Sequence, residues 1–558
     1  MAVTRLHASW LVLLAAPCLL CAGPAAAADY YVAPDGDDAN AGSLDQPFAT
    51  LQKGADVAGA GDTVYIRGGT YSITTPKTSG AGLNFTKSGT DDQHRIKYWA
   101  YEGEKPIFDF AGMTLSTSGY THGFVVKGSW LHFKGLELTN VKMNQFSNNA
   151  VAADGGGHNI YEMLDLHHLA GTGIFIGKGP GGNLILNTDA HDNYDPTSNQ
   201  GDGQNADGFG VHYQTTGETT IVRGCRAWWN SDDGYDLINQ EVPVIVENSW
   251  SMGNGYINSG KDRPGAGNGA GFKMGSSKTG VRHIVRGNLS WKNANQGFYA
   301  NHSSGGNDWY NNTAYNNGGV AFNMLASDPS DSSVTIILSG DKAHKMRNNV
   351  AFPNKTSNMM GVDTAFNTWD LMITPAAGQF ASVDDTGALG PRQPDGSLPN
   401  VDFMKLEAES PLVDKGTDVG LPAVGAAPDL GAFEYGAVPA TGGGSGGATT
   451  NGGATTNGGA ANPNGGAPGS AGSGSSSAGT PSTGNAGGAS AAAGNVGASG
   501  SATSAGASSG AASTTSTNAD DAAGCSCRLV GAAPARAPHA VLVALLACWG
   551  LARRRRTR

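Results

Sequence analysis

The feature of this chain that most limits its fold is a short strand pattern that occurs five times. Each copy begins with glycine, continues with an apolar or aromatic residue and a variable residue, and ends with another apolar residue. The glycines lie 35, 26, 37 and 26 residues apart. This spacing indicates a period near 24, interrupted by loops of about 12 residues, which is typical of a solenoid. The copies are Gly173–Ile176, Gly208–Val211, Gly234–Leu237, Gly271–Met274 and Gly297–Ala300.

A second repeat runs alongside the first and reads polar, any, small, any, any, Asn. Short β-rich strands, Gly and Asn at the corners and almost no amphipathic helix predict an all-β fold, the parallel β-helix. In such a solenoid the interior Asn or Cys at the first repeat position forms a ladder along the stack. A β-propeller is the alternative, but it needs longer and more regular blades. The copies are Thr188–Asn193, Cys225–Asn230, Asn288–Asn293, Asn312–Asn317 and Asn349–Asn354.

Stacking the first repeat in register gathers charged side chains outside the solenoid. Side chains alternate faces along a strand, so the apolar pair faces inward and the third position faces outward. Asp236 and Lys273 occupy that third position on successive strands, and Asp207 and Asp233 precede the glycine of their strands. Neighbouring coils lie about 4.8 Å apart. We therefore expect three carboxylates and one lysine in a small external patch, with Asp232 on its approach.

The two ends of the chain do not belong to this fold. Residues 1–28 contain an apolar stretch from Trp10 to Leu20 and the small residues Ala26–Ala28, which predicts a secretory signal peptide. Residues 439–523 consist almost wholly of Gly, Ala, Ser, Thr and Asn. Such a composition cannot bury enough apolar surface to fold, so we expect a disordered linker.

Residues 524–558 contain Cys525 and Cys527, an apolar run from Ala540 to Ala552, and the block Arg553–Arg556. This tail resembles the C-terminal sorting tails of myxobacterial surface proteins. The resemblance implies processing near a cysteine and retention at the cell surface. The alternative is a plain C-terminal membrane anchor, although the run is shorter than the roughly 20 residues of a full span.

The remaining residues, 29–438, form one solenoid domain that we expect to be a monomer. Phe48, Leu51, Ala55 and Ala58 follow helical spacing and predict an N-terminal helical cap. The segments 410–413 and 429–435 are predicted to be the closing strands. Cys225 is the one cysteine of the domain and occupies a buried repeat position, so no disulfide is expected.

The charge of the chain argues against a nucleic-acid partner. The formal net charge is −11, and without the eight arginines of the two end segments it becomes about −19. A protein of this charge does not attract a polyanion by its overall field. It can still bind an acidic polymer through bound cations or a local basic patch.

Four aspartates this close together cannot all ionise without compensation. Two like charges about 4 Å apart repel by roughly 4 kcal/mol at an effective dielectric of 20. Calcium suits an all-oxygen ligand set, whereas zinc prefers His or Cys. We predict a calcium ion on Asp207, Asp232, Asp233 and Asp236. The alternatives are a calcium ion that only joins two coils and a solvated acidic ridge.

Lys273 follows the glycine-rich segment 265–271, which is expected to leave room above it on an open ridge. A neighbouring cation lowers the pKa of a lysine, and a partly neutral lysine is a competent general base. A base beside calcium suits removal of a proton α to a carboxylate. The alternative role is a salt bridge to Asp236.

Three segments, Asn205–Phe209, Asn230–Asp236 and Asn268–Gly275, resemble the signature segments of polysaccharide lyase family nine. The resemblance extends from Tyr31–Pro34 to Gly431–Tyr435. It implies a right-handed parallel β-helix and pectate lyase activity. It also implies four calcium-binding aspartates, Asp207, Asp232, Asp233 and Asp236, and Lys273 as the base. Ala270 and Tyr299 depart from the family pattern, which makes the substrate less certain than the reaction.

These observations predict a secreted, surface-anchored pectate lyase. Its partner is an acidic polysaccharide, polygalacturonate, cleaved by β-elimination. Lys261 and Arg263 are candidates for binding a neighbouring carboxylate of the polymer, although solvated loop charges are the alternative. Trp228, Trp229 and Tyr235 either stack on sugars or pack in the core. Two rival functions remain, a lyase for another uronate polymer and a non-catalytic adhesin that binds polysaccharide.

Overall fold

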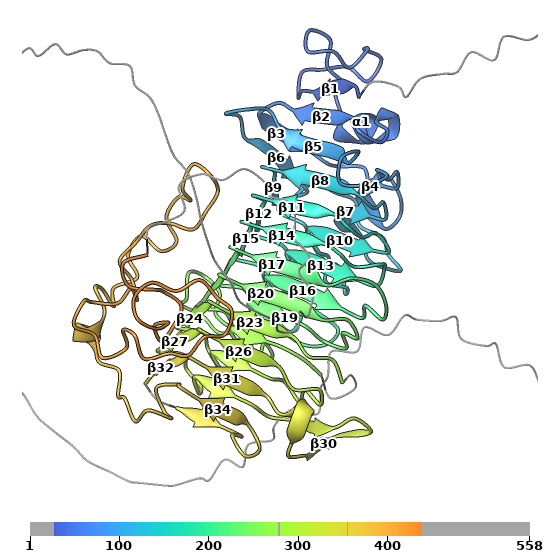
Figure 1. Cartoon of the computed structure of the whole chain (residues 1–558). Coiled ribbons are helices and arrows are strands. Elements are labelled where there is room, and N and C mark those ends of the chain that lie inside the picture. Colours follow the sequence, from blue (N-terminus) through green and yellow to red (C-terminus); the bar gives the residue numbers. More distant parts are fainter. Residues whose placement is uncertain (1–26, 277–279, 354, 438–558) are drawn as a thin grey trace, which may run out of the picture. The chain divides into compact units, whose positions relative to one another are not determined.

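The computed structural model describes residues 27–276, 280–353 and 355–437. These residues form a parallel β-helix, in which successive coils contribute strands to three long sheets (Figure 1). All pairings along these three sheets are parallel, and neighbouring strands in a sheet come from consecutive coils. The described residues therefore confirm the predicted solenoid and not the β-propeller.

Sheet 1 has 12 strands. They are β1 (Asp29–Val32), β2 (Thr63–Ile66), β5 (Ile96–Ala100), β8 (Leu131–Lys134), β11 (Ile160–Glu162), β14 (Leu184–Leu186), β17 (Thr220–Arg223), β20 (Val244–Glu247), β23 (Ile284–Arg286), β26 (Asp308–Tyr310), β31 (Lys345–Arg347) and β34 (Asp363–Ala365).

Sheet 2 has 10 strands and carries the repeated glycine pattern. They are β4 (Ala81–Phe85), β7 (His122–Val126), β10 (Val151–Asp154), β13 (Ile174–Gly177), β16 (Phe209–His212), β19 (Tyr235–Asp236), β22 (Phe272–Lys273), β25 (Phe298–Tyr299), β28 (Phe322–Asn323) and β33 (Thr356–Ser357).

Sheet 3 also has 10 strands. They are β3 (Gly69–Ser72), β6 (Pro106–Asp109), β9 (Glu137–Thr139), β12 (Asp165–His167), β15 (Asp189–His191), β18 (Arg226–Trp228), β21 (Trp250–Met252), β24 (Leu289–Trp291), β27 (Thr313–Tyr315) and β32 (Val350–Phe352). A small hairpin of β29 (Ser327–Asp328) and β30 (Asp331–Thr335) completes the strands, and the 3-10 turns η1 (Gly340–Lys342) and η2 (Ala377–Gln379) lie in later loops.

The N-terminal cap is the helix α1 (Leu51–Val57), as the apolar spacing predicted. Thr50 caps it, because its side chain accepts a hydrogen bond from the Lys53 amide. Leu51 and Ala55 are buried against the first coils together with Val32 and Val64. The helix thus covers apolar side chains at the end of the stack, which terminal units of a solenoid must do.

The interior is held together by stacked aromatic rings and by two ladders of asparagines. Phe209, Tyr235, Phe272, Phe298 and Phe322 stack along sheet 2 with centroids 4.5–5.0 Å apart. The predicted ladder is confirmed for its asparagines, because the side-chain amides of Asn288, Asn312 and Asn349 bond in series and continue to Asn367. Cys225 does not join it, since its thiol donates to backbone carbonyl oxygens. A second ladder, which the sequence analysis did not anticipate, follows the last repeat position through Asn193, Asn230, Asn254, Asn293 and Asn317.

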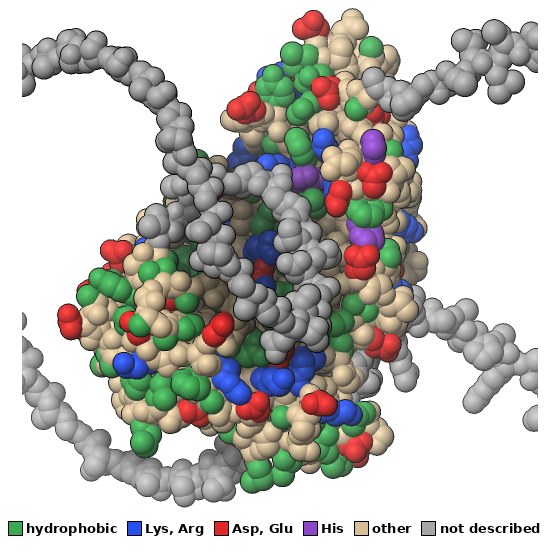
Figure 2. All heavy atoms as spheres, viewed as in Figure 1, with side chains coloured by type: hydrophobic (Ala, Val, Ile, Leu, Met, Phe, Trp, Pro, Cys, Tyr) green, Lys and Arg blue, Asp and Glu red, His purple; other side chains and the backbone are tan. Residues whose placement is uncertain are grey.

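The predicted closing strands are wrong. Residues 410–413 and 429–435 form turns and bends, not strands, and belong to a long irregular segment of residues 366–437. Leu412 and Leu430 are buried, but they pack beside sheet 3 with Trp291 and Phe403. The segment forms a bulge next to β24, β27 and β32 (Figures 1 and 2). Its apolar residues cover the side of the solenoid. The sequence pattern indicates that these residues are buried, but it does not distinguish a covering segment from paired strands.

Several predictions concern residues that the structure does not describe. The signal peptide of residues 1–28 lies almost wholly outside the described part, as do the linker 439–523 and the tail 524–558. Within the described ranges, no helix is long and apolar enough to cross a membrane. Cys225 is a buried free thiol in the core, as expected.

Candidate active site

The outward positions of sheet 2 stack as the repeat predicted. Tyr235 pairs with Phe272, so Asp236 of β19 lies opposite Lys273 of β22. On either side, Gly210 of β16 pairs with Asp236, and Tyr299 of β25 pairs with Lys273. The Lys273 Nζ atom lies 3.4 Å from Asp236 Oδ2 and 3.0 Å from Asp233 Oδ2. The lysine and two of the predicted ligands therefore meet across adjoining coils.

The other two aspartates join the same site from the turns that precede β16 and β19. One oxygen each of Asp207, Asp232 and Asp233 lies within 4.8 Å of the others. The Asp233 amide donates to Asp207 Oδ1 at 3.1 Å, which fixes the two turns against each other. The structure thus brings together all five residues that the strand pattern singled out.

The site is not the open ridge that the sequence analysis expected. Lys273 is 5% exposed, Asp207 4%, and the other three aspartates 1% or less. The glycine-rich segment lies against the carboxylates instead of leaving room above them. The Asn268 amide donates to Asp232 Oδ1 at 2.7 Å, and the Ala270 amide donates to Asp233 Oδ1 at 2.7 Å. Glycines allow this close approach because they carry no side chain.

Burial raises the pKa of all four aspartates. For Asp207 the charges of Asp236 and Asp233 raise the pKa further, and for Asp232 those of Asp233 and Asp207 do so. The Lys273 ammonium acts in the opposite direction on each of them. One ammonium does not balance four buried carboxylates, so the site favours additional positive charge.

The donor atoms of the site fit a hard cation. Among the described residues, Asp232 Oδ2 and Asp236 Oδ1 are buried oxygens that accept no hydrogen bond. A buried carboxylate oxygen without a donor is unfavourable unless a cation satisfies it. The four aspartates offer only oxygen ligands, as calcium prefers. Asp207, Asp232, Asp233 and Asp236 are therefore suited to hold a calcium ion.

The sequence analysis missed His212, which lies at the edge of the same site. Its Nε2 atom is 3.7 Å from Asp236 Oδ2, and it can share a metal with Asp207 and Asp236. Burial, with the Lys273 charge, lowers the pKa of His212 to about 3, so the ring is neutral. The alternation of β16 would have revealed it, because His212 follows the outward Gly210 by two residues.

The remaining candidates do not join the buried cluster. Lys261 and Arg263 are exposed on the loop of residues 256–267, which leads to β22. That loop contacts the loop 195–203, since the Ala266 amide donates to Asp202 O at 2.9 Å. Trp228 and Tyr235 are buried in hydrophobic clusters and Trp229 is half-buried, as the packing alternative predicted.

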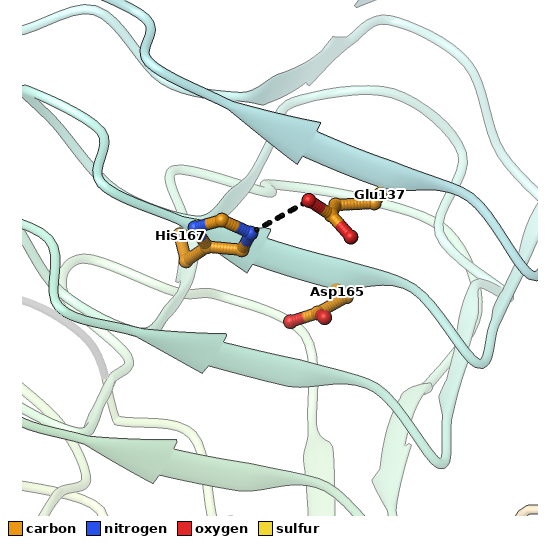
Figure 3. Close-up of side chains that lie close together, drawn as sticks. All are labelled: Glu137, Asp165 and His167. Carbon is orange, nitrogen blue, oxygen red and sulfur yellow. Dashed lines mark ion pairs between the residues drawn. The ribbon is translucent and has the colours of Figure 1, made fainter. Parts of the chain in front are cut away.

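A second group of titratable side chains lies on sheet 3, away from the glycine pattern. Glu137, Asp165 and His167 converge there, and Glu137 pairs with His167 at 3.2 Å (Figure 3). Lys105 Nζ bridges Glu137 and Asp165 at 2.5 and 3.4 Å. Asp165 also accepts from His191 at 3.1 Å. Because each carboxylate already has a cationic partner, this group is an ion-pair network.

The sequence and the fold of this chain are similar to those of known proteins. Residues 30–349 match the family model described as the Pel9A-like, right-handed β-helix region. Pectate lyase L of Dickeya dadantii (strain 3937) is 36% identical over 408 residues, which cover 73% of this chain and 90% of that protein.

Two solved structures are similar over most of their length. The crystal structure of pectate lyase Pel9A has a TM-score of 0.61 and 33% identity, covering 74% of this chain and 97% of its own. A rhamnogalacturonan lyase has a TM-score of 0.61 and 32% identity, covering 68% of this chain and 96% of its own. The matched region includes Lys273 and the four aspartates. This chain belongs to the Pel9A-like family of right-handed β-helix proteins.

Proposed function

We propose that this protein is a pectate lyase that cleaves polygalacturonate by β-elimination. The observation that carries the proposal is the Lys273 amine, 3.0 Å from Asp233 and 3.4 Å from Asp236 across adjoining coils. An amine beside a cation-binding carboxylate cluster suits removal of a proton from the carbon next to a carboxylate. The similarity to pectate lyase L supports the choice of substrate.

Each group has a defined part in this reaction. Asp207, Asp232, Asp233 and Asp236 would hold calcium, which when bound supplies positive charge to a uronate carboxylate and so acidifies its C5 proton. Lys273 would take that proton. The electron pair then forms the C4–C5 double bond, the C4–O bond breaks, and the leaving oxygen takes a proton from water. The products are a shortened chain and an unsaturated uronate end.

Lys261 and Arg263 are proposed to bind other carboxylates of the polymer. Both are exposed on the loop of residues 256–267, which leads to β22 and Lys273. Arginine can bind a carboxylate through two parallel hydrogen bonds, and lysine through one charged bond. Their substitution by alanine is expected to raise KM for polygalacturonate with little change in kcat, since such contacts are made equally in the ground and transition states.

The deciding experiment measures the unsaturated product by its absorbance, with purified protein and polygalacturonate, with and without a chelator. Activity that disappears with the chelator and returns with calcium supports the proposal. No product from any uronate polymer, with calcium present, would refute it and favour an adhesin. If the protein is an adhesin, the Lys273→Ala variant should still bind the polymer, and neither the parent protein nor the variant should show turnover.

A second candidate substrate is another uronate polymer. The 32% identical rhamnogalacturonan lyase supports this alternative, because its fold and length of match are similar to those of Pel9A. Tyr299, the neighbour of Lys273 on the next coil, departs from the expected family pattern and could alter a subsite. A panel of polygalacturonate, rhamnogalacturonan and alginate separates the alternatives by their relative rates.

We also propose that the protein is secreted and held at the cell surface as a monomeric domain. The apolar stretch and small residues of 1–28, and the cysteines, apolar run and arginine block of 524–558, support this location. Removing residues 524–558 is expected to release the enzyme into the medium. An unchanged surface fraction after that deletion contradicts the proposed anchor.

A further inference from the structure

A single residue, Asn268, contacts both the carboxylate cluster and the amine of Lys273. Its backbone amide donates to Asp232 Oδ1 at 2.7 Å. Its side-chain Oδ1 accepts from Lys273 Nζ at 3.1 Å. Asn268 thus contacts a candidate metal ligand with its main chain and the candidate base with its side chain.

Three acceptor oxygens around Lys273 Nζ differ in charge and exposure. Two are carboxylate oxygens of Asp233 and Asp236, which are 0% and 1% exposed. The third is the neutral amide of Asn268, which is half-buried and therefore nearer to solvent. Of these contacts, the one to Asn268 involves an uncharged group, whereas the other two involve carboxylates of the proposed calcium ligands.

The loop that carries Asn268 is fixed on both sides. A side chain at Gly267 would place its Cβ 1.9 Å from the Ser231 carbonyl oxygen, so the chain passes too close for any other residue. Gly269 has φ +73°, a conformation that favours glycine. The Ala270 amide is held by Asp233 Oδ1 at 2.7 Å. The Asn268 side chain therefore projects from an anchored backbone.

From these contacts we propose that Asn268 is a positioning residue, which holds the Lys273 amine in place for proton removal through its side-chain oxygen. This inference rests on the proposed function and assigns to Asn268 a role separate from metal binding. A base must point its lone pair at the proton, and the direction of its N–H bonds sets the direction of that lone pair. Displacement of a reacting group by about 1 Å can reduce the rate about 100-fold.

The test compares Asn268→Ala and Asn268→Asp in the full-length protein. In Asn268→Ala we expect kcat on polygalacturonate to fall about 10- to 100-fold with KM changed by less than about twofold, because binding contacts remain. A second readout needs no turnover: the rate at which an N-hydroxysuccinimide ester acetylates Lys273, followed by mass spectrometry with and without calcium. This rate should rise several-fold in Asn268→Ala and stay near that of the parent protein in Asn268→Asp, which keeps an acceptor oxygen.

The control is Asn400→Ala in the segment 366–437, where Asn400 Oδ1 also accepts from a lysine, Lys405 Nζ, at 2.6 Å. It removes an equivalent bond from an ammonium to an amide oxygen, and kcat and the labelling of Lys273 should not change. If Asn268→Ala does not fold, Asn268→Ser replaces it, because a hydroxyl at Cβ is too short to reach Nζ.

The outcomes separate the two proposals. Unchanged labelling of Lys273 in Asn268→Ala overturns the positioning role, whatever the activity. A rise in KM without a fall in kcat also overturns it and makes Asn268 a substrate-binding residue. If the parent protein cleaves none of the uronate polymers, the proposed function fails, and the labelling rates still decide whether Asn268 holds the amine.

Discussion

At the scale of single residues, the amine of Lys273 is the group on which the proposed reaction depends. Lys273→Met keeps most of the side-chain volume and removes the amine, so turnover should fall by about 10²- to 10⁴-fold, as for loss of a general base. Calcium binding should persist or tighten, because the ammonium that competes for Asp233 and Asp236 is gone. Product absorbance and calorimetric titration with calcium measure the two effects.

The matched control for this variant is Lys105→Met. Lys105 also bridges two carboxylates, Glu137 and Asp165, but it does so on sheet 3. Its loss should leave turnover unchanged. Loss of a general base usually reduces the rate by about 100-fold or more. If the Lys273→Met protein keeps about a tenth or more of the parent rate, Lys273 is not the base.

The residues of the site could be predicted because their spacing follows the strand period. Alternation along each strand assigned Asp236 and Lys273 to the same outer face, and the structure pairs them directly. His212 and Asn268 were missed for different reasons. His212 follows the same alternation but stands alone in its strand, whereas Asn268 reaches Lys273 from a loop whose path no periodicity determines.

At the scale of structural elements, the asparagine ladder predicts a large effect from a small change. Asn312 Oδ1 accepts from both the backbone amide and the side chain of Asn288. Asn312→Ala leaves the buried Asn288 backbone amide and one side-chain N–H of Asn288 without a partner, at about 1–3 kcal/mol for each group. The other side-chain N–H still donates to the Val246 carbonyl oxygen. We expect the free energy of unfolding to fall by roughly 3 kcal/mol in denaturant titrations.

The exposed pair Asn358 and Asn323 offers a comparison, because its amide-to-amide bond of 2.7 Å lies at the surface. Asn358→Ala should reduce stability by about 1 kcal/mol or less, part of it because Asn358 has φ 56°, a conformation that asparagine tolerates better than alanine. Equal losses in Asn312→Ala and Asn358→Ala would mean that the interior ladder contributes no more than a surface bond.

The exterior of sheet 3 predicts a pH-dependent contribution to stability. Burial alone would lower the pKa of His191, but its hydrogen bonds to Asp165 and Asp192 raise this pKa to about 9. An unfolded histidine titrates near pH 6.5. The charged ring therefore stabilises the fold fully below about pH 6.5, and this contribution disappears as the pH rises through about 9.

Between about pH 6 and 10, this contribution amounts to on the order of 3 kcal/mol. The variant His191→Gln should be less stable than the parent protein at pH 6 and nearly equal to it at pH 10. Denaturant titrations across this range give the difference. A constant difference at every pH would show that packing against Trp228, whose ring lies 4.1 Å away, and not charge, determines the effect.

Elements were predictable where the chain repeats and unpredictable where it does not. The coils, their register and the N-terminal helix follow from apolar periodicity and the asparagine positions. The segment 366–437 has no period, and its Leu412 and Leu430 bury apolar surface against sheet 3 without forming strands. Local sequence indicates that such residues are buried but not which surface they cover.

At the scale of the whole molecule, the carboxylate cluster that we propose to hold calcium lies midway along the solenoid and joins three consecutive coils. Asp207 precedes β16, Asp232 and Asp233 precede β19, and Lys273 lies on β22. A ligand that binds only the folded chain stabilises it by mass action, by about 2.7 kcal/mol at 100 times its dissociation constant. Chelation should therefore lower the melting temperature, and added calcium should restore it.

The control for this effect is the double variant Asp232→Asn, Asp236→Asn, which keeps a similar shape and removes two ligand charges. It should melt at the same temperature with or without calcium. A calcium-dependent shift that survives in this variant would locate the stabilising ion elsewhere in the molecule.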